Sequence, residues 1–83
     1  MGPVAIVGLG YVGLPTALAL LGGASQITGF DISVDRLRAI EAGDVDLGDL
    51  DRARLAMARS DDDFRLTSDS ATLAEADAVI VCV

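Results

Sequence analysis

The feature that most limits how this chain can fold is a set of three spaced glycines between two apolar segments of different character. The glycines belong to the run Gly8-Leu9-Gly10-Tyr11-Val12-Gly13, which has the pattern G-x-G-x-x-G. The preceding residues, 4–7, are apolar and mostly β-branched, as in a strand that is buried on both faces. The following residues, 14–21, predict a helix, with Pro15 in its first turn and a glycine pair directly after it. This order predicts a βα unit.

The next segment repeats the alternation of strand and helix. Residues 26–31 predict a second strand that ends on a polar residue. Ser33 is the expected N-cap of a second helix, and Gly43 lies just past its end. Three apolar residues are expected on one face of this helix: Val34, Leu37 and Ile40.

The acidic stretch 44–63 is less regular than the segments before it. A helix is predicted there from four residues that recur at helical spacing: Leu50, Ala53, Arg54 and Met57. We expect it to run from about Leu50 to Arg59.

Strands and helices alternate again at the end of the chain. Residues 64–67 predict a third strand, and Asp69 or Ser70 is expected to cap a brief helix through Glu75. The apolar run 78–83 predicts a fourth strand.

Strands that alternate with helices indicate an α/β fold with a parallel sheet and helices on both faces. Right-handed crossovers make this a Rossmann-type doubly wound sheet, of which about four strands are present. The chain has 83 residues and is 52% hydrophobic, which is apolar for a self-contained domain of this length. We therefore expect residues 1–83 to be the N-terminal part of a Rossmann domain, with apolar surface that further chain or a partner covers.

In such a fold each glycine of the loop has a physical task. Gly8 makes the tight turn, Gly10 lets the backbone approach a pyrophosphate, and Gly13 lets the helix pack on the strand. The phosphates lie at the helix N-terminus, where unpaired N–H groups and the helix dipole favour anions.

Asp31 ends the predicted second strand, eighteen residues after Gly13. Near this spacing an acidic side chain accepts hydrogen bonds from the hydroxyls of the adenosine ribose. Its charge would repel a 2′-phosphate, so the sequence favours NAD over NADP. Local physics leaves three alternatives open: an Asp31 that only caps the following helix, a glycine loop that is a packing turn without a ligand, and a site for FAD or S-adenosylmethionine.

Composition limits the partners and the chemistry. Thirteen acidic and six basic residues give a net charge of −7, which disfavours nucleic acid and anionic membranes as partners. No apolar run is long enough to span a membrane and the first residues lack the basic region of a signal peptide, so we expect a cytoplasmic protein. Cys82 is the only cysteine, and His, Lys and Asn are absent. We therefore expect no metal site and no catalytic residue in this stretch.

The run from Val4 to Pro15 resembles the opening of the UDP-glucose/GDP-mannose dehydrogenase family, in which the form G-x-G-Y-V-G-L-P recurs. Asp31, Arg36 five residues later, and the closing segment 74–83 fit the same family pattern. The resemblance therefore extends from one end of the chain to the other.

This resemblance implies a set of NAD-binding residues beyond the three glycines. The backbone of Tyr11 and Val12 would contact the pyrophosphate, and Asp31 would bind the adenosine ribose. Arg36 would lie beside the adenosine moiety, with an exposed helix residue as the alternative. Val83 would begin a turn beside the cofactor.

The family resemblance also implies a reaction, the NAD-dependent oxidation of the C6 alcohol of a UDP- or GDP-sugar to the uronate by two hydride transfers. The catalytic cysteine, Lys and Asn would lie in central and C-terminal domains outside this chain, and the full-length protein would form a homodimer. Cys82 is expected to be a small buried residue near the cofactor, not the nucleophile. The sequence of residues 43–47, Gly-Asp-Val-Asp-Leu, resembles the UDP-N-acetylhexosamine branch of the family more than the GDP-mannose enzymes.

Two other functions share a strand, a glycine loop and an acidic residue. One is a regulatory module that senses NAD or another nucleotide, like those attached to potassium transport systems, and that performs no chemistry. The other is a different Rossmann dehydrogenase, such as a 3-hydroxyacid type. The continuation Tyr11-Val12-Gly13-Leu14-Pro15 argues against the regulatory module.

Overall fold

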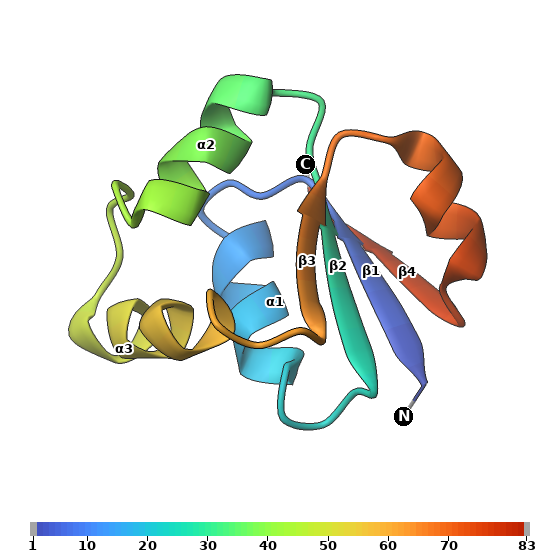
Figure 1. Cartoon of the computed structure of the whole chain (residues 1–83), viewed down its shortest axis with the longest axis horizontal. Helices are drawn as coiled ribbons and strands as arrows, with labels where there is room; N and C mark the ends of the chain where they lie inside the picture. Colours follow the sequence, from blue (N-terminus) through green and yellow to red (C-terminus); the bar gives the residue numbers. More distant parts are fainter. Residues whose placement is uncertain (1, 83) are drawn as a thin grey trace.

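Four parallel strands form the sheet of this protein, in the order β3-β2-β1-β4 (Figure 1). In the computed structural model, which describes residues 2–82, the strands are β1 (Pro3–Val7), β2 (Gln26–Phe30), β3 (Phe64–Thr67) and β4 (Ala78–Val81). The central strand β1 pairs in parallel with β2 on one side and β4 on the other. The chain thus moves outward from β1 to β3 and then returns to the other side of β1. This confirms the predicted α/β doubly wound sheet and places its topological switch point between β1 and β4.

Helices lie on both sides of the sheet, as the sequence predicts (Figure 1). The α-helices α1 (Gly13–Leu20), α2 (Val34–Ala42) and α3 (Asp49–Ala58) lie on one side. The 3-10 helix η1 (Ser70–Glu75) lies on the other side. The longest of these helices, α3, has ten residues, and none in residues 2–82 is long and apolar enough to cross a membrane.

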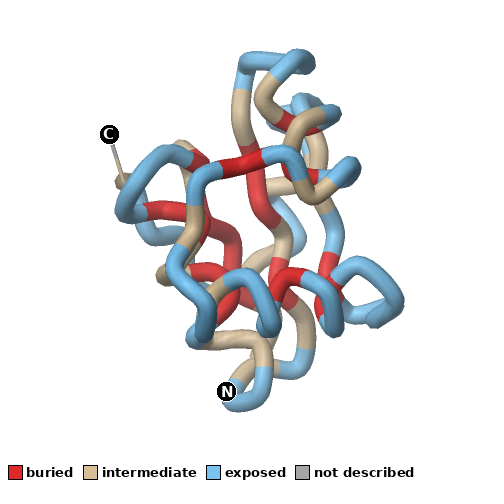
Figure 2. The backbone as a smooth tube through the Cα atoms, turned by 90° about the vertical axis from the view of Figure 1, so that its left-hand side faces the viewer, coloured by how far each residue is buried: buried red, intermediate tan, exposed pale blue. Residues whose placement is uncertain are grey.

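The hydrophobic core lies between the sheet and the layer of three α-helices. Figure 2 shows the buried segments as short stretches enclosed by exposed ones. The large side chains that are fully buried in this core are Val4, Ile6, Leu9, Leu14, Ile27, Ile40 and Leu55. Leu9 belongs to the glycine loop, so the loop is anchored in the same core that holds the helices on the sheet.

The helix ends follow from particular residues. Ser33 caps α2, because its Oγ accepts a hydrogen bond from the N–H of Arg36 at 3.1 Å. Gly43 ends α2 with φ of 74°, a left-handed conformation that a residue with a side chain rarely adopts. Asp69 caps η1 by accepting the N–H of Ala71 at 3.0 Å. The sequence signals for these ends are confirmed, with Asp69 in place of Ser70 as the cap.

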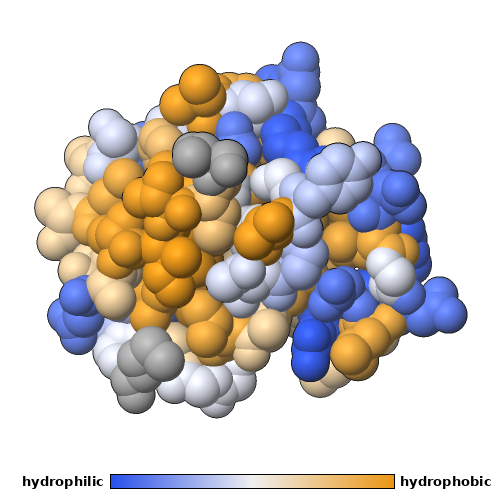
Figure 3. Space-filling view, turned by 180° about the vertical axis from the view of Figure 1, so that it is seen from behind, coloured by the Kyte–Doolittle hydropathy of each residue, from blue (hydrophilic) through white to orange (hydrophobic). Residues whose placement is uncertain are grey.

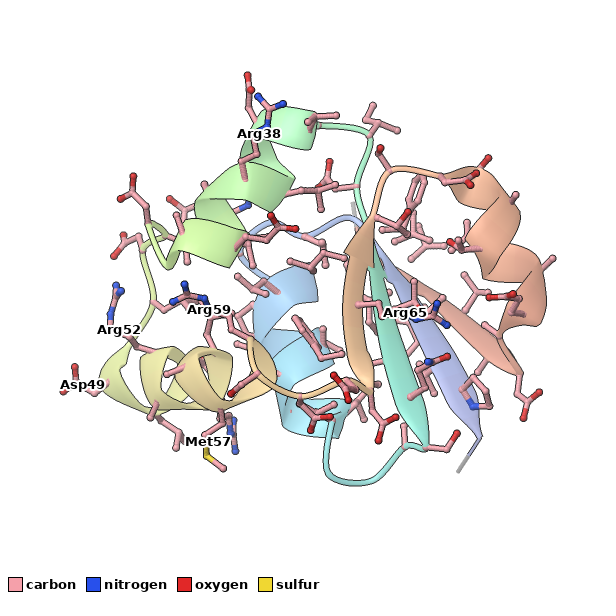
Figure 4. All side chains as sticks on the ribbon, viewed as in Figure 1. Arg38, Asp49, Arg52, Met57, Arg59 and Arg65 are labelled. Atoms are coloured by element: carbon pink, nitrogen blue, oxygen red, sulfur yellow. The ribbon has the colours of Figure 1, made fainter. Side chains whose placement is uncertain are left out.

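The helix predicted in the acidic stretch is confirmed as α3, but the four residues whose spacing predicted it lie on its exposed side. Leu50 and Met57 are 65% and 77% exposed, and Ala53 and Arg54 are exposed beside them. The residues that α3 buries are Leu55 and Ala58. Helical spacing was recognised correctly, but α3 contacts α1 through the neighbouring face, and Met57 points away from the body of the protein (Figure 4). Val34 of α2, expected with Leu37 and Ile40, is also 46% exposed.

The outer strand β4 leaves apolar side chains uncovered. Val79, Ile80 and Val81 are 47%, 37% and 62% exposed. Figure 3 shows hydrophobic surface gathered on the face seen from behind. Strand β4 therefore carries part of the exposed apolar surface that the composition predicts.

Candidate functional site

The glycine loop leaves β1 at the carboxyl end of the sheet, beside the switch point. Gly8 has φ of 93°, and a Cβ there would run into the carbonyl oxygen of Cys82 in the segment after β4. A Cβ on Gly13 would run into the carbonyl oxygen of Gly8 and lie 3.3 Å from the Cβ of Cys82. The fold itself therefore requires glycine at both positions, for a tight turn and for a close approach of α1 to the loop.

Gly10 differs from both of these glycines. It is exposed, it lacks a positive φ, and a Cβ built on it would have no atom within 4 Å among the described residues. The packing of the chain therefore gives no reason for glycine here. A methyl group at Gly10 would point into the open space around the loop.

The loop presents a row of unused hydrogen-bond donors. Within residues 2–82, the backbone N–H groups of Gly10, Tyr11, Val12 and Gly13 donate to no protein acceptor. Val12, the N-cap of α1, supplies no side-chain cap, and the first turn has no acidic residue. The side chains of Tyr11 and Val12 are 88% and 67% exposed and Gly10 is exposed as well, whereas Gly13 is buried at the start of α1. Free N–H groups on exposed residues at the positive end of a helix dipole suit an anion.

Asp31 lies directly beside this loop. It follows β2, and its N–H donates to the carbonyl of Thr67 at 3.1 Å. Its Oδ2 accepts the N–H of Leu9 at 3.0 Å and its Oδ1 accepts the N–H of Ser33 at 2.9 Å. The structure thus brings together the glycines and the acidic residue that the sequence singled out. The N-cap of α2 is Ser33, so capping that helix is not the main role of Asp31.

Arg36, in the first turn of α2, also reaches the glycine loop. Its Nε donates to the carbonyl oxygen of Leu9 at 2.8 Å. Arg36 is half-buried and is therefore not the exposed helix residue that the sequence left as an alternative.

Leu9 is the residue of this site that sequence reasoning missed. Its side chain is fully buried, and its two Cδ atoms occupy the space above Gly29 in the middle of β2. A Cβ on Gly29 would lie 3.1 Å from each of these Cδ atoms. The signal that could have found this contact is the glycine inside a strand, which often marks a close approach.

A cleft of ≈ 440 Å³ lies between the glycine loop, α2 and the connection from α2 to α3. Its lining residues are Gly10, Tyr11, Pro15, Arg36, Asp46, Leu47, Gly48 and Asp51. Arg52 holds the connection in place, since its guanidinium donates to the carbonyls of Gly43 and Val45 at 3.3 and 2.8 Å (Figure 4). Like Leu9, residues 46–51 were not recognised from the sequence as bordering the site.

The remaining predicted residues lie after β4. Cys82 packs against the hydrophobic core, and its N–H donates to the carbonyl of Val7 at 2.7 Å. This is the expected place of a small apolar residue beside the loop. Val83 lies outside the described residues.

Comparison with known proteins agrees with this geometry. Residues 3–83 match the family model described as the UDP-glucose/GDP-mannose dehydrogenase family, NAD binding domain. The chain belongs to this family. The family resemblance drawn from the glycine loop, Asp31 and Arg36 is therefore confirmed, and so is the fold that it implied.

Similar proteins of the family are nucleotide-sugar dehydrogenases. The UDP-N-acetyl-D-mannosamine dehydrogenase of Escherichia coli strain K12 is 32% identical over 80 residues, which cover 96% of this chain and 19% of that protein. The solved UDP-D-ManNAc dehydrogenase of Pyrococcus horikoshii has a TM-score of 0.88 at 28% identity, covering 98% of this chain and 20% of that one. A GDP-mannose dehydrogenase of Pseudomonas aeruginosa has a TM-score of 0.84 at 27% identity, with 96% and 19% covered. This chain thus spans about a fifth of the length of these relatives.

Proposed function

We propose that this chain is the NAD-binding part of a nucleotide-sugar 6-dehydrogenase that oxidises the C6 alcohol of a UDP- or GDP-sugar to the uronate by two hydride transfers. The observation that carries the proposal is the row of four free N–H groups, Gly10 to Gly13, beside the carboxylate of Asp31. A row of free N–H groups can donate hydrogen bonds to the oxygens of a pyrophosphate. A carboxylate can accept hydrogen bonds from the two hydroxyls of a ribose. NAD contains both groups, and family membership supports NAD as the ligand.

The residues present fit NAD. Gly10 leaves open space before the donor row, so the pyrophosphate would meet the N–H groups without a side chain between them. Each carboxylate oxygen of Asp31 accepts one backbone N–H, and each has room for one more hydrogen bond from a ribose hydroxyl. Val83 would lie near the same site as the start of the next turn. When bound, NAD supplies the hydride acceptor, and the residues of this chain hold it.

The sugar and the catalytic groups belong to other parts of the proposed enzyme. This chain has no Lys, Asn or His, and its one cysteine, Cys82, packs against the core beside Gly8. We therefore place the nucleophile, its assisting residues and most of the sugar site in the rest of a homodimeric protein. The names of its relatives and the sequence of residues 43–47 favour a UDP-N-acetylhexosamine as the substrate.

The test is an assay of the full-length protein with NAD and a panel of nucleotide sugars: UDP-N-acetylmannosamine, UDP-N-acetylglucosamine, UDP-glucose and GDP-mannose. We expect NADH with a UDP-N-acetylhexosamine, at two NADH per uronate formed. If the protein binds NAD but forms no NADH with any of these sugars, the proposed dehydrogenase activity is overturned and the protein is a nucleotide-binding module. NADH at one equivalent per product would overturn the oxidation to the uronate.

A further inference from the structure

Residues 29–31, at the end of β2 and just beyond it, hold the first two residues of the glycine loop. The carbonyl of Phe30 accepts the N–H of Gly8 at 2.9 Å. Oδ2 of Asp31 accepts the N–H of Leu9 at 3.0 Å. The third contact involves a side chain, since Leu9 lies against Gly29. The row of free N–H groups begins at the next position of the loop, so this end of β2 holds the chain directly before the row.

The side chain of Leu9 occupies a gap that Gly29 leaves in the sheet. Gly29 pairs with Ile6 of β1 and with Leu66 of β3, so these three positions point to the same face of the sheet. A Cβ on Gly29 would lie 3.1 Å from both Cδ atoms of Leu9 and 2.9 Å from Cδ2 of Leu66. Leu9 therefore fills space in this row that a side chain at position 29 would take.

No backbone conformation explains why position 29 is a glycine. Gly29 lies inside β2 and has no positive φ. Glycine weakens a strand interior and often marks a place where another part of the chain approaches closely. Here the part that approaches is the side chain of Leu9.

Leu9 is also the strongest anchor of the loop. Among residues 8–12 it alone is buried, with 0% of its side chain exposed, whereas Tyr11 and Val12 are exposed. The burial of a leucine side chain contributes more to stability than a typical backbone hydrogen bond does. The position of the loop above the sheet therefore depends chiefly on Leu9.

We propose that Leu9 is a positioning residue for the pyrophosphate of NAD, and that Gly29 provides the space that this role requires. The buried side chain of Leu9 adds no surface to the site, and it acts by holding the loop in place. A loop that is already ordered loses little conformational freedom when an anion binds to its N–H groups. The proposal rests on the proposed function, since it assumes that NAD is the ligand.

The experiment measures NAD binding to the full-length protein by calorimetry, at a temperature well below the lowest melting temperature of the variants. The test variant is Leu9→Ala and the matched control is Leu55→Ala. Both leucines are buried in the same core, at 0% and 2% exposed, but Leu55 belongs to α3 and not to the loop. Both substitutions remove the same atoms and leave a cavity, so both variants should lose stability.

We expect Leu9→Ala to weaken NAD binding roughly 10-fold, the cost of ordering about one more residue on binding. Leu55→Ala should bind NAD as the native protein does. Leu9→Met, which keeps an apolar side chain of similar volume, should retain most of the native affinity. Native affinity in Leu9→Ala would overturn the proposal. An equal loss in Leu55→Ala would overturn it too, because the effect would then follow stability and not the loop.

Gly29→Ala tests the other side of the contact without removing any atom of the loop. Its methyl group would push against both Cδ atoms of Leu9, so NAD should again bind more weakly. When Leu9→Ala and Gly29→Ala are combined, the methyl group enters the space that Leu9 leaves. The loss of affinity should then be smaller than the product of the two single losses. Losses that simply multiply would show that Gly29 does not act through Leu9, which would overturn the proposal.

Two further outcomes are distinguished by the same measurements. If Leu9→Ala does not fold, the smaller change Leu9→Val takes its place, and native NAD affinity in Leu9→Val would overturn the proposal. A native protein that binds no NAD would overturn the proposed function together with this proposal. Native affinity in the Leu9 variants would overturn this proposal alone.

Discussion

The Oδ2 atom of Asp31 accepts the N–H of Leu9 at 3.0 Å, and this bond joins the end of β2 to the glycine loop after β1. Asp31 therefore has a structural task in addition to its proposed contact with ribose. Its other oxygen accepts the N–H of Ser33, so the side chain is oriented before any ligand arrives. A carboxylate that is already ordered loses little conformational freedom on binding.

Replacing Asp31 should affect binding and stability together. We expect Asp31→Ala to weaken NAD binding by about 1–3 kcal/mol, because the ribose loses a charged acceptor. The free energy of unfolding should fall by about 1 kcal/mol, since the N–H groups of Leu9 and Ser33 lose their partner. Calorimetry with NAD and urea denaturation of the full-length protein measure the two effects. Asp35→Ala, an exposed acid on α2, is the control, and unchanged NAD affinity in Asp31→Ala would refute the ribose role.

The glycines of the loop should separate into two classes on substitution. Gly10→Ala should leave the melting temperature near that of the native protein, because a Cβ there meets no atom within 4 Å. It should nevertheless weaken NAD binding by about 1 kcal/mol or more, since the methyl group occupies the approach to the donor row. Gly13→Ala should instead lower the melting temperature, because its Cβ runs into the carbonyl of Gly8.

Gly22→Ala serves as the control for Gly10→Ala, since a Cβ on Gly22 also meets nothing within 4 Å and Gly22 lies at the far end of α1. It should change neither stability nor binding appreciably. Normal NAD affinity in Gly10→Ala would mean that the space before the loop is not used by the cofactor.

The buried face of α3 leads to a stability prediction. Leu55→Ala should lower the free energy of unfolding by about 2–5 kcal/mol, because Leu55 is 2% exposed and its removal leaves a cavity. Met57→Ala, on the same helix and 77% exposed, should stay within about 0.5 kcal/mol of the native value. Urea denaturation compares the two directly. A larger loss for Met57→Ala than for Leu55→Ala would mean that the exposed face is covered in the full-length protein.

The elements of this fold were predictable because each depends on residues close together in the chain. Ser33 and Gly43 delimit α2 by local hydrogen bonds and a local φ, so they were recognisable from sequence. The face of α3 was not, since helical spacing shows that residues share a side but does not say which side meets α1. The missed contact is Arg36 to Leu9, which depends on how α2 packs over a loop 27 residues earlier.

The orientation of Arg36 bears on the choice between NAD and NADP. A 2′-phosphate on the adenosine ribose would lie near the carboxylate of Asp31 and needs a cation to offset that charge. Arg36 is the cation nearest in sequence to Asp31, and its Nε is bonded to the carbonyl of Leu9. We therefore expect NAD to bind more tightly than NADP by about 1–2 kcal/mol, the size of a Coulomb repulsion at close range in a solvent-exposed site. Asp31→Ala should narrow this gap by weakening NAD more than NADP. Equal affinities for the two cofactors in the native protein would show that the carboxylate does not lie beside the 2′ position.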